Sequence, residues 1–160
     1  MGTPQTSQAS IQARLDEASR LRYKGSNTQA VTFLEETLYL CREAGFIEIE
    51  ARIWGDLGLG YKNLGRFEEA VSSLRQAIDL HGKLARLDDL AVGLKNLGSA
   101  LTDLGRIEES LPLYQEARDI CHSIGDLRGI ATCEIFIGNA YQRLAVCRRT
   151  KFSLDSNSWL

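Results

Sequence analysis

Glycines recur at forty-residue intervals along this chain, and that spacing constrains its fold more than any other feature. Two series show the interval: Gly25, Gly65 and Gly105, and Gly58, Gly98 and Gly138. Self-similarity at a fixed period of this length is typical of repeat proteins, in which each supersecondary unit stacks on the next. The chain is therefore predicted to be a row of similar units.

Apolar residues within each unit follow the period of a helix. The clearest unit starts at Ala51 and contains Trp54-x-x-Leu57-Gly58-x-x-Tyr61, followed by Gly65, Ala70, Leu74 and Ala77. Spacings of i, i+3, i+4 and i+7 indicate two amphipathic helices per unit. The corresponding residues of the next unit are Leu94, Leu97, Gly98, Leu101, Gly105, Ser110, Tyr114 and Ala117. Weaker first and fourth units carry Ala18, Leu21, Gly25, Ala30 and Leu34, and Ile137, Gly138 and Tyr141.

The two glycine series have different predicted roles. Gly65 and Gly105 end the first helix of their units, where a positive φ favours glycine. Gly58 lies within a helix, where glycine costs about 1 kcal/mol relative to alanine, so we expect a neighbouring helix to approach closely there. Ala70 and Ala77 are the small residues expected at that contact, with Trp54, Tyr61 and Leu74 filling the space around it.

The unit boundaries define the expected domain organisation. Residues 1–10 are predicted to be a flexible leader, residues 11–146 an array with units starting near 11, 51, 91 and 131, and residues 147–160 a divergent, incomplete last helix or tail. Pro112 is expected to bend its helix or shift the start of that helix. The incomplete fourth unit is expected to leave apolar residues uncovered. These are Ile135, Ile137 and Leu144.

The motif Trp-x-x-Leu-Gly-x-x-Tyr, followed by Ala-x-x-x-Leu, resembles the tetratricopeptide repeat, whose usual period is 34. The proline that usually closes the second helix is absent, since Arg42, Gly82 and His122 occupy that position. The long units are similar to those of G-protein signalling modulators of the Pins type, rapsyn and kinesin light chain, and also to repeats of bacterial and fungal multidomain regulators. The resemblance implies an all-α fold of antiparallel helix pairs stacked as a right-handed α-solenoid.

The resemblance also implies a non-enzymatic adaptor that binds a peptide or helical segment of a partner protein in a concave groove lined by the first helices. Phe136, Arg22 and Tyr23 lie on the expected groove face. The residues predicted to bind the peptide are Arg52, Lys62, Asn63, Lys95, Asn96, Ser99, Asp103, Asn139, Gln142 and Arg143. The alternative is a self-associating module, a homo-oligomer formed through the incomplete C-terminal unit, or a regulatory fragment of a larger signalling or transcription regulator.

Composition and short motifs weigh against several other functions. A net charge of −2 gives no excess of Lys and Arg for binding nucleic acid. No apolar run approaches the roughly 20 residues that span a bilayer. Gly2 fits the loose N-myristoylation pattern, but no polybasic stretch follows, so no stable membrane association is expected. Four cysteines without a CxxC pair or a signal peptide favour reduced thiols and a cytoplasmic location.

No catalytic, cofactor or metal motif is recognisable in the sequence. The glycines of Gly55–Gly60 are wrongly spaced for a nucleotide loop and lie in a predicted helix. His81 and His122 are expected to be solvated residues near helix C-termini. Because Cys41 occupies the repeat position of Cys121 but is followed by arginine, both cysteines are predicted to be buried and inert. We therefore expect no enzyme, no cofactor and no metal site.

Overall fold

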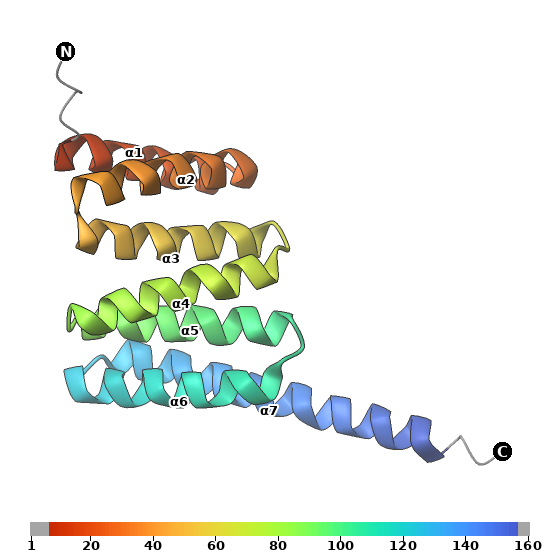
Figure 1. Ribbon diagram of the computed structural model, residues 1–160. Helices are drawn as coiled ribbons and strands as arrows, with labels where there is room; N and C mark the ends of the chain where they lie inside the picture. Colours follow the sequence, from red (N-terminus) through yellow and green to blue (C-terminus); the bar gives the residue numbers. More distant parts are fainter. Residues whose placement is uncertain (1–6, 157–160) are drawn as a thin grey trace.

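The computed structural model describes residues 7–156, with the side chains of residues 7–149, and every element in this part of the chain is an α-helix. Seven helices follow one another in layers (Figure 1). Their bounds are α1 Gln8–Tyr23, α2 Asn27–Ala44, α3 Ile47–Asn63, α4 Phe67–Lys83, α5 Leu87–Asp103, α6 Ile107–Ile124 and α7 Leu127–Ser156. The starts of α3, α5 and α7 are forty residues apart, which confirms the predicted period.

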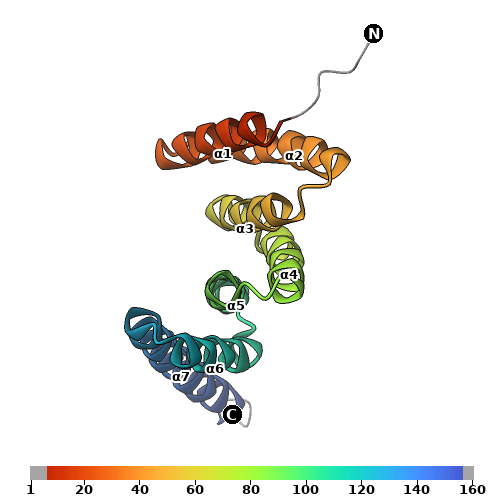
Figure 2. The same ribbon diagram turned by 90° about the vertical axis from the view of Figure 1, so that its left-hand side faces the viewer.

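The helices stack as antiparallel pairs, and each helix packs on the next one in the chain. Viewed along the helices, α1, α3, α5 and α7 lie on one side of the stack and α2, α4 and α6 on the other (Figure 2). Contacts between α3 and α5 and between α5 and α7 join the pairs on the first side. This arrangement confirms the predicted all-α repeat solenoid, and it places the first helix of each pair along one continuous face.

Residues with a positive φ end the helices, as the first glycine series predicted. At the end of α3, Gly65 has a φ of +72°, and the backbone N–H of Arg66 donates to the carbonyl oxygen of Tyr61 at 2.9 Å. This is the hydrogen bond of a Schellman motif, which requires a left-handed residue at the position of Gly65. At the end of α4, the same position is occupied by Ala85, with a φ of +52°.

Ala85→Gly is expected to raise the free energy of unfolding by up to about 1 kcal/mol, because an alanine in the left-handed region is strained by about that amount and glycine is not. Gly45 and Gly125, which lie forty residues on either side, already have φ values of +74°. Gly125→Ala provides the matched control and should be destabilising. Urea denaturation followed by circular dichroism measures both changes, and a loss of stability in Ala85→Gly would contradict the assignment.

Large side chains rather than alanines fill the close contacts at Gly58 and Gly98 of the second glycine series. A Cβ atom added at Gly58 would lie 2.5 Å from Cγ of Leu74, and one added at Gly98 would lie 2.6 Å from Cε1 of Tyr114. The predicted close approach is therefore present, but the partner of Gly58 is Leu74 and not Ala70 or Ala77. The glycine provides the room into which a side chain of the second helix fits.

The two ends of the array differ from the predicted boundaries. The first helix begins at Gln8, where the Ser7 side chain accepts a hydrogen bond from the backbone N–H of Ser10, so it includes the last residues of the expected leader. Residues 1–6 lie outside the described residues. At the other end, α7 continues to Ser156 without a turn, so residues 147–156 prolong the first helix of the fourth unit instead of starting a second one.

Pro112 lies inside α6 without shifting the start of this helix, since Ile107 follows the start of α4 by forty residues. Another expectation about the C-terminal half requires correction. Ile137 was expected to be uncovered but is buried, because it packs in a cluster with Ile107 and Tyr114. Ile135 is exposed as predicted, with 63% of its surface accessible.

Candidate functional site

Adjoining hollows lie along the face that α1, α3 and α5 share. One of about 410 Å³ lies between α1 and α3, and its lining residues are Ser19, Arg22, Tyr23, Leu59 and Asn63. The next, of about 300 Å³, lies between α3 and α5 and shares Ser19 and Leu59 with the first. We call this second space the α3–α5 hollow. A third hollow, near the start of α3, adjoins the α3–α5 hollow. Arg52, His81 and Asp89 line both the third hollow and the α3–α5 hollow.

The α3–α5 hollow exists because small residues face each other across it. Gly55 and Gly93 come from the two first helices and Ala77 from α4. A Cβ atom at Gly55 would have no other atom within 4 Å, so this position opens directly into the space. The apolar residues Leu59, Leu74 and Val92 also line the hollow. Its charged and polar lining residues are Ser19, Arg52, Asp56, His81, Asp89 and Asn96. The hollow therefore combines an apolar interior with polar groups.

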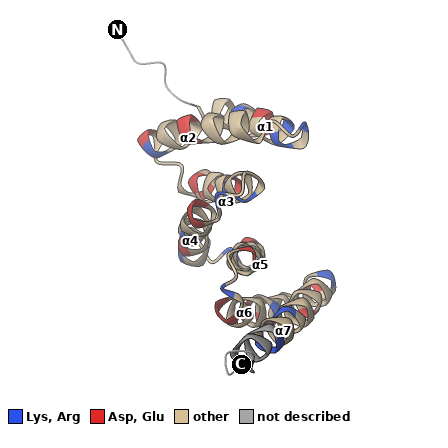
Figure 3. Cartoon of the chain, turned by 90° about the vertical axis from the view of Figure 1, so that its right-hand side faces the viewer, with Lys and Arg blue, Asp and Glu red and all other residues tan. Residues whose placement is uncertain are grey.

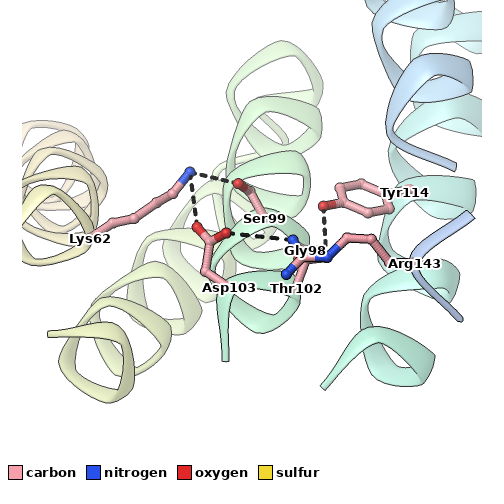
Figure 4. A network of polar contacts seen from close by, with 7 residues as sticks. All are labelled: Lys62, Gly98, Ser99, Thr102, Asp103, Tyr114 and Arg143. Atoms are coloured by element: carbon pink, nitrogen blue, oxygen red, sulfur yellow. Dashed lines mark hydrogen bonds and ion pairs between the residues drawn. The ribbon is translucent and has the colours of Figure 1, made fainter. Parts of the chain in front are cut away.

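Four of the predicted site residues form a polar network across three repeats (Figure 4). The Lys62 ammonium donates to Oγ of Ser99 at 2.6 Å and lies 3.6 Å from Oδ2 of Asp103. The other carboxylate oxygen of Asp103 lies 3.9 Å from a guanidinium nitrogen of Arg143. Lys62 belongs to α3, Ser99 and Asp103 to α5, and Arg143 to α7. The structure thus brings these residues together, but their charged groups contact one another.

The remaining predicted residues fall into two groups. Arg52 donates to Oε1 of Gln12 at 3.1 Å and Asn63 to Oδ1 of Asn27 at 3.3 Å, so both are engaged within the array. Within residues 7–149, the side chains of the others form no hydrogen bond or ion pair. These are Lys95, Asn96, Asn139 and Gln142. Of these four, only Asn96 lines one of the hollows.

Sequence reasoning missed several groove residues that the forty-residue register could have identified. Asp56 occupies the register position of Asn96, and Leu59 that of Ser99. Asp56 accepts a 2.7 Å hydrogen bond from Arg22, which links α1 to α3 on the face of the hollows. By contrast, Phe136 was placed on the groove face but is half-buried, with its ring stacked on Tyr114 at a centroid distance of 5.2 Å. Phe136 is therefore a packing residue.

His81 is buried, which corrects the expectation of a solvated histidine. Only 7% of its surface is exposed, and it lines the α3–α5 hollow from α4. Its Nδ1 atom has no hydrogen-bond partner among the described residues. Oδ2 of Asp89 is 3.9 Å from that atom, and the same oxygen forms an ion pair with Arg86 at 2.9 Å. Burial lowers the pKa of His81, and Asp89 offsets part of this effect.

The lowered pKa of His81 predicts a loss of stability in mild acid. As the pH falls, the unfolded chain takes up a proton on this histidine before the folded protein does. The free energy of unfolding therefore decreases as the pH drops below about 6.5, the ordinary pKa of histidine. His81→Gln should reduce the decline of the melting temperature between pH 7.5 and pH 5.5. An unchanged decline in this variant would show that His81 does not titrate with the expected shift.

The buried thiols lie in apolar surroundings. Cys41, Cys121 and Cys133 are buried and unpaired, as predicted for the first two. Burial raises the pKa of Cys41 and of Cys133 to about 11, which keeps both thiols protonated at neutral pH. Among the described residues, no three His, Cys, Asp or Glu side chains are grouped so that they could hold a metal ion. No described helix is long and apolar enough to cross a membrane.

Two segments match the tetratricopeptide repeat family, residues 51–82 and residues 90–124. These segments correspond to the α3–α4 and α5–α6 pairs, whose first helices line the α3–α5 hollow.

Solved structures with the same architecture come from several organisms. The nearly identical TPR-like repeats of a protein designated kinesin light chain from Podosopora anserina superpose with a TM-score of 0.77 and 17% identity, covering 96% of this chain and 75% of that one. BtubC (BKLC) from P. vanneervenii superposes with a TM-score of 0.79 and 19% identity, covering 92% of this chain and 61% of that one. Aspartyl phosphate phosphatase F from Bacillus subtilis superposes with a TM-score of 0.81 and 11% identity, covering 92% of this chain and 38% of that one. At these identities the likeness establishes a shared fold.

Proposed function

Because two of its helix pairs match the tetratricopeptide repeat, we propose that this chain is a non-enzymatic adaptor that binds a segment of a partner protein in the groove along α1, α3, α5 and α7. Tetratricopeptide repeats are modules for protein–protein interaction, and their stacked units create extended binding surfaces. The observation that carries the proposal is the α3–α5 hollow, which lies on this face. Its combination of an apolar interior with a few polar groups is typical of a binding pocket.

The dimensions and lining of the hollow define the kind of segment that fits. A space of about 300 Å³ accommodates one apolar side chain, which Leu59, Leu74 and Val92 would contact. Asn96, whose amide has no partner in residues 7–149, can donate to and accept from the backbone of the bound segment.

Charges on the surrounding face extend this description. Lys95 lies next to Asn96 on α5 and makes no ion pair with a described residue, so its ammonium is available to an acidic side chain. Acidic and basic residues are interspersed along the stack (Figure 3), which favours a partner of mixed composition. The proposed ligand is therefore a segment with one apolar anchor and a neighbouring acidic residue. The buried free thiols support a reducing, cytoplasmic setting.

Selection of ligands from a random peptide library displayed on phage tests this proposal without a known partner. The immobilised 160-residue protein is the target, and Gly55→Leu is the key variant. Its added side chain fills the α3–α5 hollow, and the Cβ atom at Gly55 meets no other atom within 4 Å, so the helix tolerates the change. Enriched peptides should bind wild type and lose at least about tenfold in affinity for Gly55→Leu.

Gly82→Leu is the matched control, because a Cβ atom at Gly82 also has no neighbour within 4 Å and this residue lines none of the hollows described above. This variant should bind the selected peptides as wild type does. Lys95→Glu and Asn96→Ala should weaken binding without loss of helicity in circular dichroism. If no peptide is enriched, or if Gly55→Leu binds as tightly as wild type, the groove is not the binding site.

A further inference from the structure

The fourth unit presents a helix face that is covered in the second and third units. In those units, Gly58 and Gly98 each lie beneath a large side chain of the following helix, Leu74 or Tyr114, at 2.5 and 2.6 Å from an added Cβ atom. Gly138 occupies the same register position on α7, but a Cβ atom added there has no neighbour within 4 Å. The notch that receives a side chain in the second and third units is therefore open in α7.

Residues around Gly138 show the same difference. Tyr141 is 54% exposed, whereas its counterparts Tyr61 and Leu101 are 9% and 1% exposed. Ala131 is also exposed, although Ala51 and Ala91 at its register position are buried. Ala131, Gly138 and Tyr141 therefore form a surface, which we call the α7 notch, that matches the buried side of α3 and α5.

The three complete pairs define the helix that fits such a surface. The second helix of each pair presents a small residue, a large residue four positions later and a small residue three positions after that. All nine residues are buried: Ala30, Leu34 and Thr37 in α2, Ala70, Leu74 and Ala77 in α4, and Ser110, Tyr114 and Ala117 in α6. We propose that the α7 notch docks an amphipathic helix of a partner protein with this small-x₃-large-x₂-small pattern, and that the large residue enters the notch at Gly138.

Charge supports the same occupant and its orientation. The first turns of α4 and α6 carry Glu68 and Glu69 or Glu108 and Glu109, and negative charge there stabilises a helix. A helix that lies antiparallel to α7, as α4 does to α3, would have its first turn near the C-terminal half of α7. Arg148 and Arg149 are exposed in that half, where Arg148 also lies 3.9 Å from Oε1 of Glu108. The C-terminal part of α7 projects beyond the stack (Figure 1).

A second copy of the chain is a poorer source of this helix. The three helices of the described chain with the required pattern already bury it in their own pairs. A partner helix is therefore the occupant that the repeat geometry specifies. This docking surface is separate from the groove and does not depend on it.

Direct titration tests the proposal with a probe taken from this chain. A fluorescein-labelled synthetic peptide of residues 66–85, which contains α4 and its flanking residues, is added to the intact protein and followed by fluorescence anisotropy. Saturable binding is expected, and Gly138→Leu should weaken it at least about tenfold, because the leucine occupies the notch. Thermal unfolding of Gly138→Leu checks that the fold is kept.

Controls separate this surface from the groove and from self-association. A peptide with Leu74→Asp should not bind, whereas the protein variants Gly82→Leu and Gly55→Leu should bind the unmodified peptide as wild type does. Absence of binding, or equal binding by Gly138→Leu, would overturn the proposal. Sedimentation showing a dimer that Gly138→Leu dissociates would also overturn it, since the occupant would then be a second copy of this chain.

Discussion

Tyr114→Ala is expected to lower the free energy of unfolding by about 3–5 kcal/mol, the usual result of truncating a large buried aromatic side chain. Tyr114 is 2% exposed, covers Gly98, and stacks on Phe136 with the ring planes 22° apart. Its removal would open a cavity between α5, α6 and α7. Because α7 packs against this part of α6 and on no later helix among the described residues, the fourth unit should be the first to lose structure.

Urea denaturation followed by circular dichroism measures the change. Tyr114→Phe is the matched control, since it keeps the ring and loses only the hydroxyl group, which is 3.3 Å from Oγ1 of Thr102. This variant should lose no more than about 1.5 kcal/mol, the usual contribution of one hydrogen bond. A loss below about 1 kcal/mol in Tyr114→Ala would show that the ring does not hold the third and fourth units together.

Gly98→Ala and Gly138→Ala are expected to change stability in opposite directions, although both replace a glycine at the same register position within a helix. Alanine at Gly138 meets no neighbouring atom and should gain up to about 1 kcal/mol from its helix propensity. Alanine at Gly98 would contact three ring atoms of Tyr114 at 2.6–3.0 Å. Overpacking of this kind typically costs about 1–3 kcal/mol, so we expect a net loss of stability.

A double-mutant cycle identifies the cause of the difference. In the Tyr114→Ala background the ring is absent, and Gly98→Ala should then become neutral or stabilising relative to Tyr114→Ala alone. If Gly98→Ala costs the same with and without the ring, the contact with Tyr114 is not what excludes a side chain from position 98.

Periodicity allowed the architecture to be predicted because the period and the helix ends are both local properties of the sequence. The apolar spacing sets the helix faces, and Gly65 and Gly105 mark positions where the backbone must adopt a positive φ. The long α7 has a related cause. Ala145 stands where these glycines stand in the earlier units, and alanine favours continuation of the helix over a left-handed turn. The substitution was visible in the sequence, but the uninterrupted helix was not predicted from it.

Contacts between helices could not be predicted from spacing alone. Ala70 and Ala77 were expected opposite Gly58, yet side chains in a helix point along directions that depend on their rotamers, and Leu74 fills that place. His81 was expected in solvent because only its position near the end of α4 was visible. Its burial depends on how α4 and α5 pack, with Asp89 of α5 next to the imidazole.

The candidate groove was predicted in its location more fully than in its residues. Repeat register placed Arg52, Asn63 and Asn96 on helices that line the hollows. It did not reveal that Lys62, Asp103 and Arg143 would contact one another, because these contacts depend on the distance between neighbouring first helices. Gly55 has no side chain to suggest a role, although the space above it makes the α3–α5 hollow possible.

The most direct test of the proposed adaptor function is to map the binding site of a selected peptide on the ¹⁵N-labelled protein by NMR. We expect the largest amide chemical-shift changes at residues lining the α3–α5 hollow, including Gly55, Asp56, Val92 and Asn96. Changes confined to exposed residues of the second helices, such as Glu36, Arg75 and Glu116, would place the ligand on the opposite side of the stack and contradict the account.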